Sequence, residues 1–208
     1  MNKKVIAIIV AIAVVIIGSY VFIYQPYQEN LLSGQFNEGL QNASSVETQI
    51  ITTTDEFNKQ SSTDVDVLIG TINNDITPKY SDELLKLNQT AKLTNNNNTK
   101  KKYIDLQMKR VELESQNIKS TVTKLNAISQ YVKGEKNAQD AQTSINNADT
   151  AMSNSQKELQ QVYTDINTLL KQNPSFNQTL QDLKLEKPYY GETRTQTQTQ
   201  NITNSTET

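Results

Sequence analysis

The sequence predicts an all-α protein with three parts: an N-terminal single transmembrane helix, an elongated antiparallel helical bundle or coiled coil of about four long helices, and a disordered C-terminal tail. One long apolar run opens the chain of 208 residues. Further along, apolar residues recur at alternating steps of three and four, as on helices. Gly and Pro number only 6 and 4, too few for a turn-rich β-sandwich.

The apolar run at residues 5–24 predicts a membrane anchor. It contains no charged residue, and about 20 such residues span a hydrocarbon core of about 30 Å. Lys3 and Lys4 precede it, so the positive-inside rule places residues 1–4 in the cytoplasm and the bulk of the chain outside. A cleaved signal peptide is the alternative, although Ile17, Gly18 and Ser19 match a cleavage site poorly.

Residues 25–187 are expected to form the extracytoplasmic helical bundle. A first helix is predicted over residues 32–57 and a second over residues 65–91, after good N-cap residues at 61–64. Pro78 lies inside the second: either it kinks the helix, or Thr77 caps a new helix with Pro78 at its first position. A polar loop is predicted over residues 95–99.

The third and fourth helices carry the clearest pattern. Apolar or small residues form one seam over residues 104–132 and another over residues 136–172, with a break at Lys133, Gly134 and Glu135. A short link with Gly just past a helix end predicts an antiparallel hairpin; one continuous rod with a phase slip is the alternative. Leu106 and Leu113 lie off the seam, so a third element is expected to contact that helix.

The end of the bundle is predicted to be a short helix, followed by a loose tail. Pro174 stops the fourth helix, and Ser175 and Gln178 have the spacing of a capping box. Phe176, Leu180 and Leu183 would give the short helix its apolar face. Residues 188–208 are rich in Thr, Gln and Asn, bury too little to offset their ordering entropy and are predicted to be disordered.

The composition narrows the possible chemistry. The chain has no His and no Cys, which excludes Ser-His and Cys-His catalysis and the usual zinc sites. Asp64 and Asp66 are the one pair resembling metal ligands, but a helix cap and a first-turn carboxylate explain them better. We therefore predict no catalytic, cofactor-binding or metal residues.

The net charge is −2, and the basic cluster Lys100, Lys101 and Lys102 is interpreted as a solvated loop beside a helix start, so no nucleic-acid partner is expected.

These observations favour a non-enzymatic, membrane-anchored extracytoplasmic protein with a structural, scaffold or surface-interaction role. The expected location is the cell membrane, in a single pass. Its expected partners are the lipid bilayer, through residues 5–24, and a second copy or another helical protein. A ligand-sensing or accessory subunit of a membrane complex is the alternative. A carboxylate enzyme using Asp64 and Asp66 on wall polymers is a third, weaker hypothesis.

Overall fold

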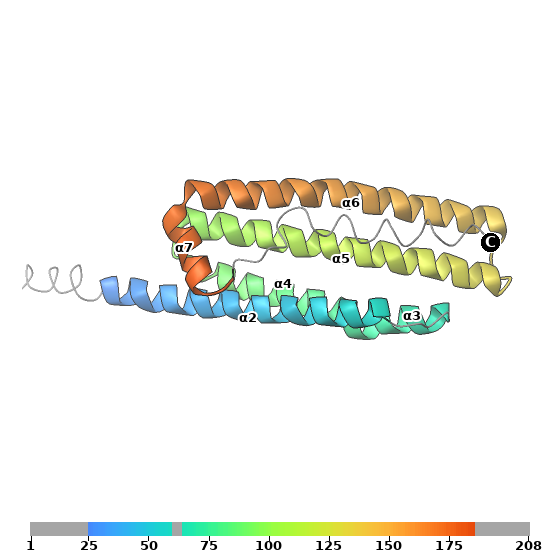
Figure 1. The fold of residues 1–208 in the computed structure, drawn as a ribbon, viewed down its shortest axis with the longest axis horizontal. Helices are drawn as coiled ribbons and strands as arrows, with labels where there is room; N and C mark the ends of the chain where they lie inside the picture. The colour runs from blue at the N-terminus through green and yellow to red at the C-terminus, as the bar shows by residue number, and fades with distance from the viewer. Residues whose placement is uncertain (1–24, 60–63, 186–208) are drawn as a thin grey trace, which may run out of the picture.

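The structure is a computed structural model that describes residues 25–59 and 64–185, with side chains from residue 31 onward. Within these ranges it is helical, as predicted, and contains no strand. The elements, shown in Figure 1, are α2 (Gln25–Lys59), α3 (Val65–Thr71), the π-helical turn η2 (Ile72–Ile76), α4 (Thr77–Ala91), α5 (Asn98–Val132), α6 (Ala138–Gln172) and α7 (Pro174–Asp182).

The predicted anchor at residues 5–24 and the predicted tail at residues 188–208 both lie outside the described ranges. Among the helices that the structure does describe, none combines the length and the apolar character needed to cross a bilayer.

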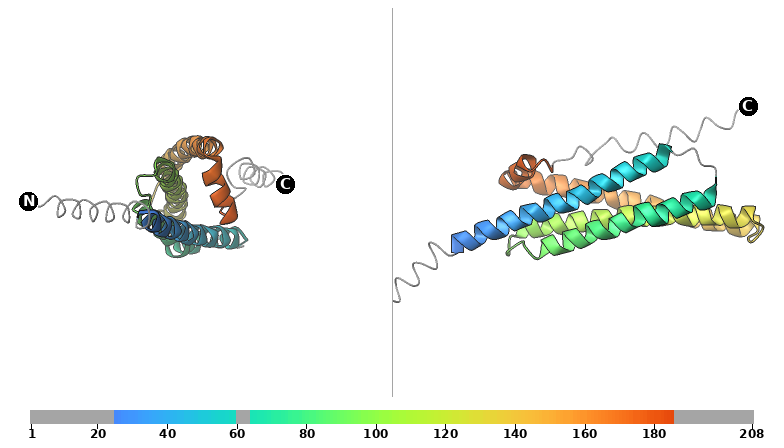
Figure 2. Two further views of the ribbon diagram at one scale, coloured as in Figure 1. Left: turned by 90° about the vertical axis from the view of Figure 1, so that its left-hand side faces the viewer. Right: turned by 90° about the horizontal axis from the view of Figure 1, so that it is seen from below.

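The helices form a curved layer in which each long helix runs antiparallel to the next. Helix α2 packs against α4, α4 against α5, and α5 against α6, while the outer helices α2 and α6 are not neighbours. Viewed end-on in Figure 2, α7 spans the open side between α6 and α2. There the ring of Phe176 lies 6.4 Å from that of Phe36 and 5.3 Å from that of Tyr103. The short helix therefore closes one end of the layer.

The α5–α6 hairpin confirms the predicted link at Gly134 and makes the continuous rod wrong. Gly134 has a φ of +76°, a left-handed conformation that suits glycine after a helix end. Lys109 pairs with Glu158 at 3.4 Å, and Lys124, nearer the turn, pairs with Asp149 at 2.6 Å. Residues closer to the turn on α5 therefore meet residues closer to it on α6, as in an antiparallel pair.

The core follows the predicted seams most closely in the half of the layer where α2 and α4 cover the hairpin. Phe36, Ile104, Val111 and Ile166 have no exposed side-chain surface. Leu113, which lies off the seam, is also buried, and α5 packs against α4 as well as α6. The expected third element is therefore α4.

Two predicted helix starts are corrected. Thr77 has helical backbone angles and its N–H donates to the carbonyl of Ile72, so it is no cap and the chain stays helical through the π turn. The wider turn accommodates Pro78, which has no N–H to donate. Helix α7 begins at Pro174 with Asn173 in the N-cap position, so the capping box at Ser175 is wrong: the proline takes the first helical position.

Candidate functional site

A buried ionic cluster centred on Arg110 is the most polar feature of the core. Arg110 is 3% exposed and contacts carboxylates from three elements: Glu47 of α2, Glu83 of α4 and Glu114 of its own helix α5. All three carboxylates are themselves buried. The cluster therefore ties together three helices that adjoin one another in the layer.

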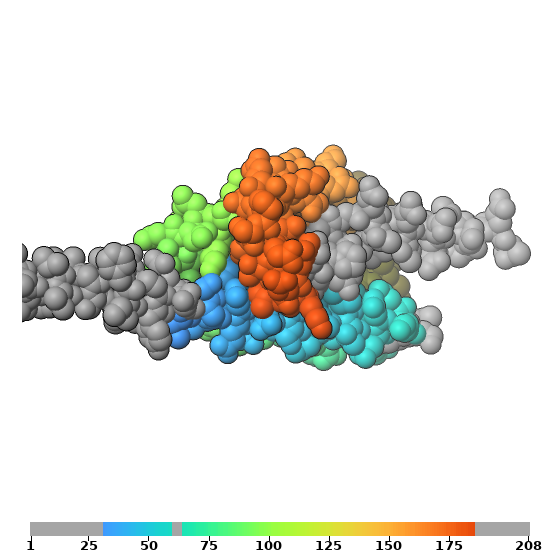
Figure 3. All heavy atoms as spheres, turned by 60° about the vertical axis from the view of Figure 1, so that its left-hand side comes forward, coloured from blue at the N-terminus to red at the C-terminus, as the bar shows by residue number. Residues whose placement is uncertain are grey.

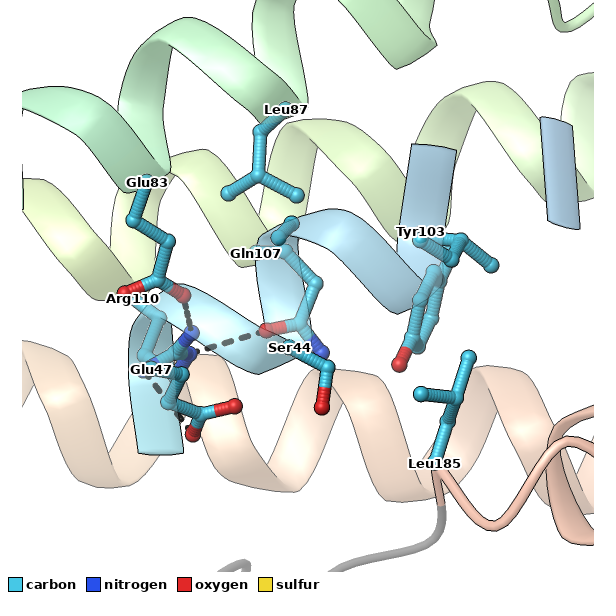
Figure 4. A pocket seen from close by; sticks show the side chains of 10 residues that line it. Ser44, Glu47, Glu83, Leu87, Tyr103, Gln107, Arg110 and Leu185 are labelled. Atoms are coloured by element: carbon cyan, nitrogen blue, oxygen red, sulfur yellow. Dashed lines mark hydrogen bonds and ion pairs between the residues drawn. The ribbon is translucent and has the colours of Figure 1, made fainter. Parts of the chain in front are cut away.

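The N–H groups of the Arg110 guanidinium contact several side chains at once. Its Nη1 lies 3.4 Å from Glu47 and 3.0 Å from Glu114, its Nη2 donates to Glu83, and its Nε donates to the Oε1 of Gln107 at 2.8 Å. Figure 4 shows the guanidinium between the carboxylates of Glu83 and Glu47. Such multidentate contacts are the strength of arginine over lysine, because its five donors are fixed in one plane.

Helix α6 joins this cluster through a tyrosine. The hydroxyl of Tyr163 donates to Oε1 of Glu114 at 3.0 Å, while the other oxygen of Glu114 faces Arg110. The polar network therefore reaches all four long antiparallel segments of the layer, from α2 to α6.

The protonation of Glu83 depends first on its burial and then on the charges around it. The net effect of burial, the opposing attraction of Arg110 and the neighbouring charges of Glu47 and Glu114 is to raise the pKa of Glu83 from 4.5 to about 7, and burial is the largest of these causes. Its Oε2 is buried and has no hydrogen-bond partner among the described residues. Near neutral pH the Glu83 side chain therefore exchanges a proton inside the core.

A small cavity adjoins the cluster between α2, α4 and α5, with Leu185 at its edge (Figure 4). Its volume is about 30 Å³, an order of magnitude below the roughly 300 Å³ or more of sites that hold small organic ligands. It is lined in part by Ser44, Leu87 and Tyr103 beside the charged groups. Its size suits water or a proton rather than a metabolite.

The sequence analysis missed this cluster, although a signal for it was present. It singled out neither Arg110 nor the carboxylates that surround it. Arg110 and Arg194 are the only arginines in the chain. Arg110 stands at i+3 from Gln107 and i−4 from Glu114, on the side of the helix marked by the off-seam Leu106 and Leu113. An arginine on an apolar face flanked by polar residues at helical spacing indicates a buried network.

Asp64 and Asp66 do not form a joint site. Asp64 caps α3, confirming the prediction, since its Oδ1 accepts the N–H of Asp66 at 2.9 Å. Asp66 instead accepts from the hydroxyl of Ser129 at 2.7 Å and the ammonium of Lys133 at 2.6 Å. These two bonds hold the pKa of Asp66 below its usual value, and the bond to Asp66 raises the pKa of Lys133. The pair of bonds fastens α3 to the last turn of α5.

The same end of the hairpin, which we call the distal tip, exposes large apolar side chains. Ile128, Tyr131 and Val132 lie at helical spacing on one side of α5 and are 37%, 52% and 76% exposed. Val67 of α3, next to the bonded Asp66, is also exposed. The predicted seam of α5 thus ends in solvent at Val132.

Among the predicted loop lysines, Lys100 differs from its neighbours. Its ammonium group lies 4.6 Å from the ring centre of Phe36 and donates to the hydroxyl of Ser33 at 3.1 Å, and burial lowers its pKa. Lys101 and Lys102 are exposed, as predicted. The loop ends two residues earlier than predicted, because Asn97 caps α5 by accepting the N–H of Lys100 and the helix begins at Asn98.

The fold and its polar core define an all-helical, layered bundle with a buried arginine–carboxylate network. Comparison with known protein families, curated proteins and solved structures found no significant match.

Proposed function

We propose that this chain is a non-enzymatic, membrane-anchored extracytoplasmic scaffold whose copies contact one another through the distal tip. Residues 5–24 would hold the chain in the membrane, and the helical layer would stand outside it. The proposal depends on one observation above the others: the exposed apolar residues Ile128, Tyr131 and Val132 lie at the end of the layer opposite the start of α2 (Figure 1).

The length of the helices supports a role as a spacer. Helices α2 and α5 have 35 residues each, which gives a length of about 50 Å at a rise of about 1.5 Å per residue. A chain anchored just before Gln25 would hold its distal tip far from the bilayer surface. The ionic cluster around Arg110, half-way along the layer, supports a rigid arrangement of the helices.

Anchoring also supports a second copy as the occupant of the tip. Identical chains held by the same anchor display their tips at the same height, so equal patches meet without any further alignment. A two-fold contact brings a patch against itself and favours patches that carry both charge signs. The tip meets this condition, because Asp66 and Lys133 flank its apolar residues.

Disulfide trapping in membranes tests the proposal, and the natural chain has no Cys to interfere. We expect Val132→Cys in the full chain to yield covalent dimers under mild oxidation. Lys119→Cys is the matched control: it is exposed on the same helix, about 20 Å further from the tip. Equal trapping at both positions, or none at Val132, would overturn the self-association. Extraction of the protein by alkaline carbonate would overturn the anchoring.

A sensing or accessory role is the second candidate, and the raised pKa of Glu83 favours it. When a carboxyl group among four packed helices gains or loses a proton near neutral pH, the charge inside the core changes. A change of pH would therefore change the stability of the helix packing. The cavity of about 30 Å³ beside it argues against a metabolite as the signal. A stabilising metabolite in a thermal-shift screen of the full chain would reverse this ranking.

A further inference from the structure

We propose that the end of the layer nearest the anchor docks on the anionic headgroups of the bilayer through a cluster of lysines, which we call the basic end. The lysines are Lys92, Lys100, Lys101, Lys102, Lys171 and Lys184. This inference rests on the anchoring in the proposed function. It adds a second contact with the membrane, made by the folded layer itself.

The fold gathers these lysines from distant parts of the sequence. Lys92 follows α4, the next three are in the first turns of α5, Lys171 is in the last turn of α6, and Lys184 follows α7. Figure 1 shows these four places at the same end of the layer, beside the first half of α2, and in Figure 3 that end comes forward. Because α2 contains no basic residue before Lys59, the fold rather than the adjoining sequence supplies the positive charge.

This end carries excess positive charge, although the whole chain has a net charge of −2. The segments 25–38, 92–105 and 165–185 contain those six lysines against five carboxylates, Glu29, Glu38, Asp105, Asp165 and Asp182. Within the part of the chain that the structure describes, none of the six forms an ion pair. Among the lysines further along the layer, Lys109, Lys124 and Lys133 each pair with a carboxylate.

Helix stability does not explain the lysines at the start of α5. The N-terminus of a helix carries partial positive charge, so cations in its first turn are unfavourable and carboxylates are favourable. The first turn of α5 has no acidic residue, and Lys100, Lys101 and Lys102 stand there instead. An anionic surface facing this helix end would offset that repulsion, since it would attract both the lysines and the positive end of the helix dipole.

The geometry of α2 sets the height of the basic end above the bilayer. Lys100 bonds to Ser33, which lies eight residues, or about 12 Å, along the helix from Gln25. The headgroup layer takes up about 5 to 8 Å of that height beyond the hydrocarbon edge at residue 24. The remaining gap is below the Debye length of about 8 Å at physiological ionic strength. Exposed lysine side chains at this height reach the field of anionic headgroups.

A depth measurement on the full chain in vesicles tests the docking. A fluorophore is attached at Asn98→Cys, an exposed position at the start of α5, and at Gln130→Cys near the distal tip. Quenching by spin-labelled headgroups is compared between phosphatidylcholine vesicles and vesicles containing phosphatidylglycerol. We expect stronger quenching at position 98 in the anionic vesicles only, reversed by about 0.5 M salt, and none at position 130.

Neutralising variants give the matched control. K92Q/K101Q/K102Q should weaken docking by about fivefold per lysine, or on the order of 100-fold together, and quenching should fall to the level in neutral vesicles. K59Q/K119Q/K157Q removes three exposed lysines elsewhere and should quench like the parent. Equal quenching in both vesicle types, or quenching at position 130 as well, overturns the docking while leaving the anchor intact. Failure of the parent chain to float with either vesicle type overturns the anchoring and the docking together.

Discussion

Replacing Glu83 by Gln should remove a pH dependence of stability that the buried carboxyl group imposes on the fold. The pKa of Glu83 rises from 4.5 to about 7 on folding. Between these values the folded chain binds more protons than the unfolded chain, so the free energy of unfolding falls as pH rises. A difference of about 2.5 pKa units corresponds to about 3 kcal/mol, lost between pH 4.5 and pH 7 and constant above that range.

The glutamine variant isolates this contribution because it keeps an acceptor for Arg110 and cannot ionise. We expect E83Q to match the parent near pH 4.5 and to exceed its unfolding free energy by about 3 kcal/mol at pH 8. The assay is urea unfolding of the full-length protein in mild detergent, followed by helical circular dichroism at a series of pH values. The chain has no His, so no imidazole titrates in this window.

Glu112→Gln provides the control, since it removes an exposed carboxylate from the same helix as Arg110. It should leave the slope of the parent unchanged. If E83Q loses as much stability as the parent between pH 5 and pH 8, the titrating group is elsewhere. If the parent becomes more stable over that range, the attraction of Arg110 outweighs burial and our account of the cluster is wrong.

Three further substitutions probe the packing and the polar contacts of the described residues. Arg110→Met leaves buried carboxylates without their cation and should cost about 3–5 kcal/mol in urea unfolding at pH 8. Gly39→Ala should cost about 1–3 kcal/mol, because a Cβ at Gly39 would lie 2.4 Å from Oγ1 of Thr90; Gly34→Ala, with open space around it, should gain up to about 1 kcal/mol. The fold lowers the pKa of Asp66. Its carboxylate therefore stabilises the folded chain at pH values above the pKa of the unfolded chain, and this stabilisation is lost as the pH falls through the pKa of the folded chain. Asp66→Asn should therefore flatten the loss of stability measured below about pH 4.

The helical segments could be predicted from the sequence because each helix buries one apolar face against a neighbouring helix. Val111 and Ile166 stand at seam positions, and both are fully buried. Leu113, which breaks the seam, correctly indicated a further contact. These predictions succeed because the three-and-four spacing is local: it depends on residues within a few turns, whatever the partner helix is.

The features that sequence reasoning missed depend on residues far apart in the chain. Arg110 and Glu83 are 27 positions apart, and the sequence around each is also typical of a solvated helix face. The π turn at Ile72–Ile76 likewise depends on how the chain passes Pro78 while α4 stays packed against α2. No local signal distinguishes that solution from a kink or a new helix.

The cluster around Arg110 addresses a weakness of the apolar seams. Seam positions such as Ala141, Ala148 and Ser155 of α6 are seven residues apart and are buried but small, so sliding α6 by two turns would exchange one small residue for another at little cost. The same slide, about 10 Å, would take Tyr163 of α6 out of reach of Glu114 and leave that buried carboxylate with one partner fewer, a loss of about 1–3 kcal/mol. The hydrophobic pattern thus selects helices that pair, and the ionic cluster penalises every register but one. The ionised Glu83 side chain lowers the stability of the folded chain near neutral pH. This cost agrees with a cluster that serves to fix the register of the helices rather than to raise the total stability.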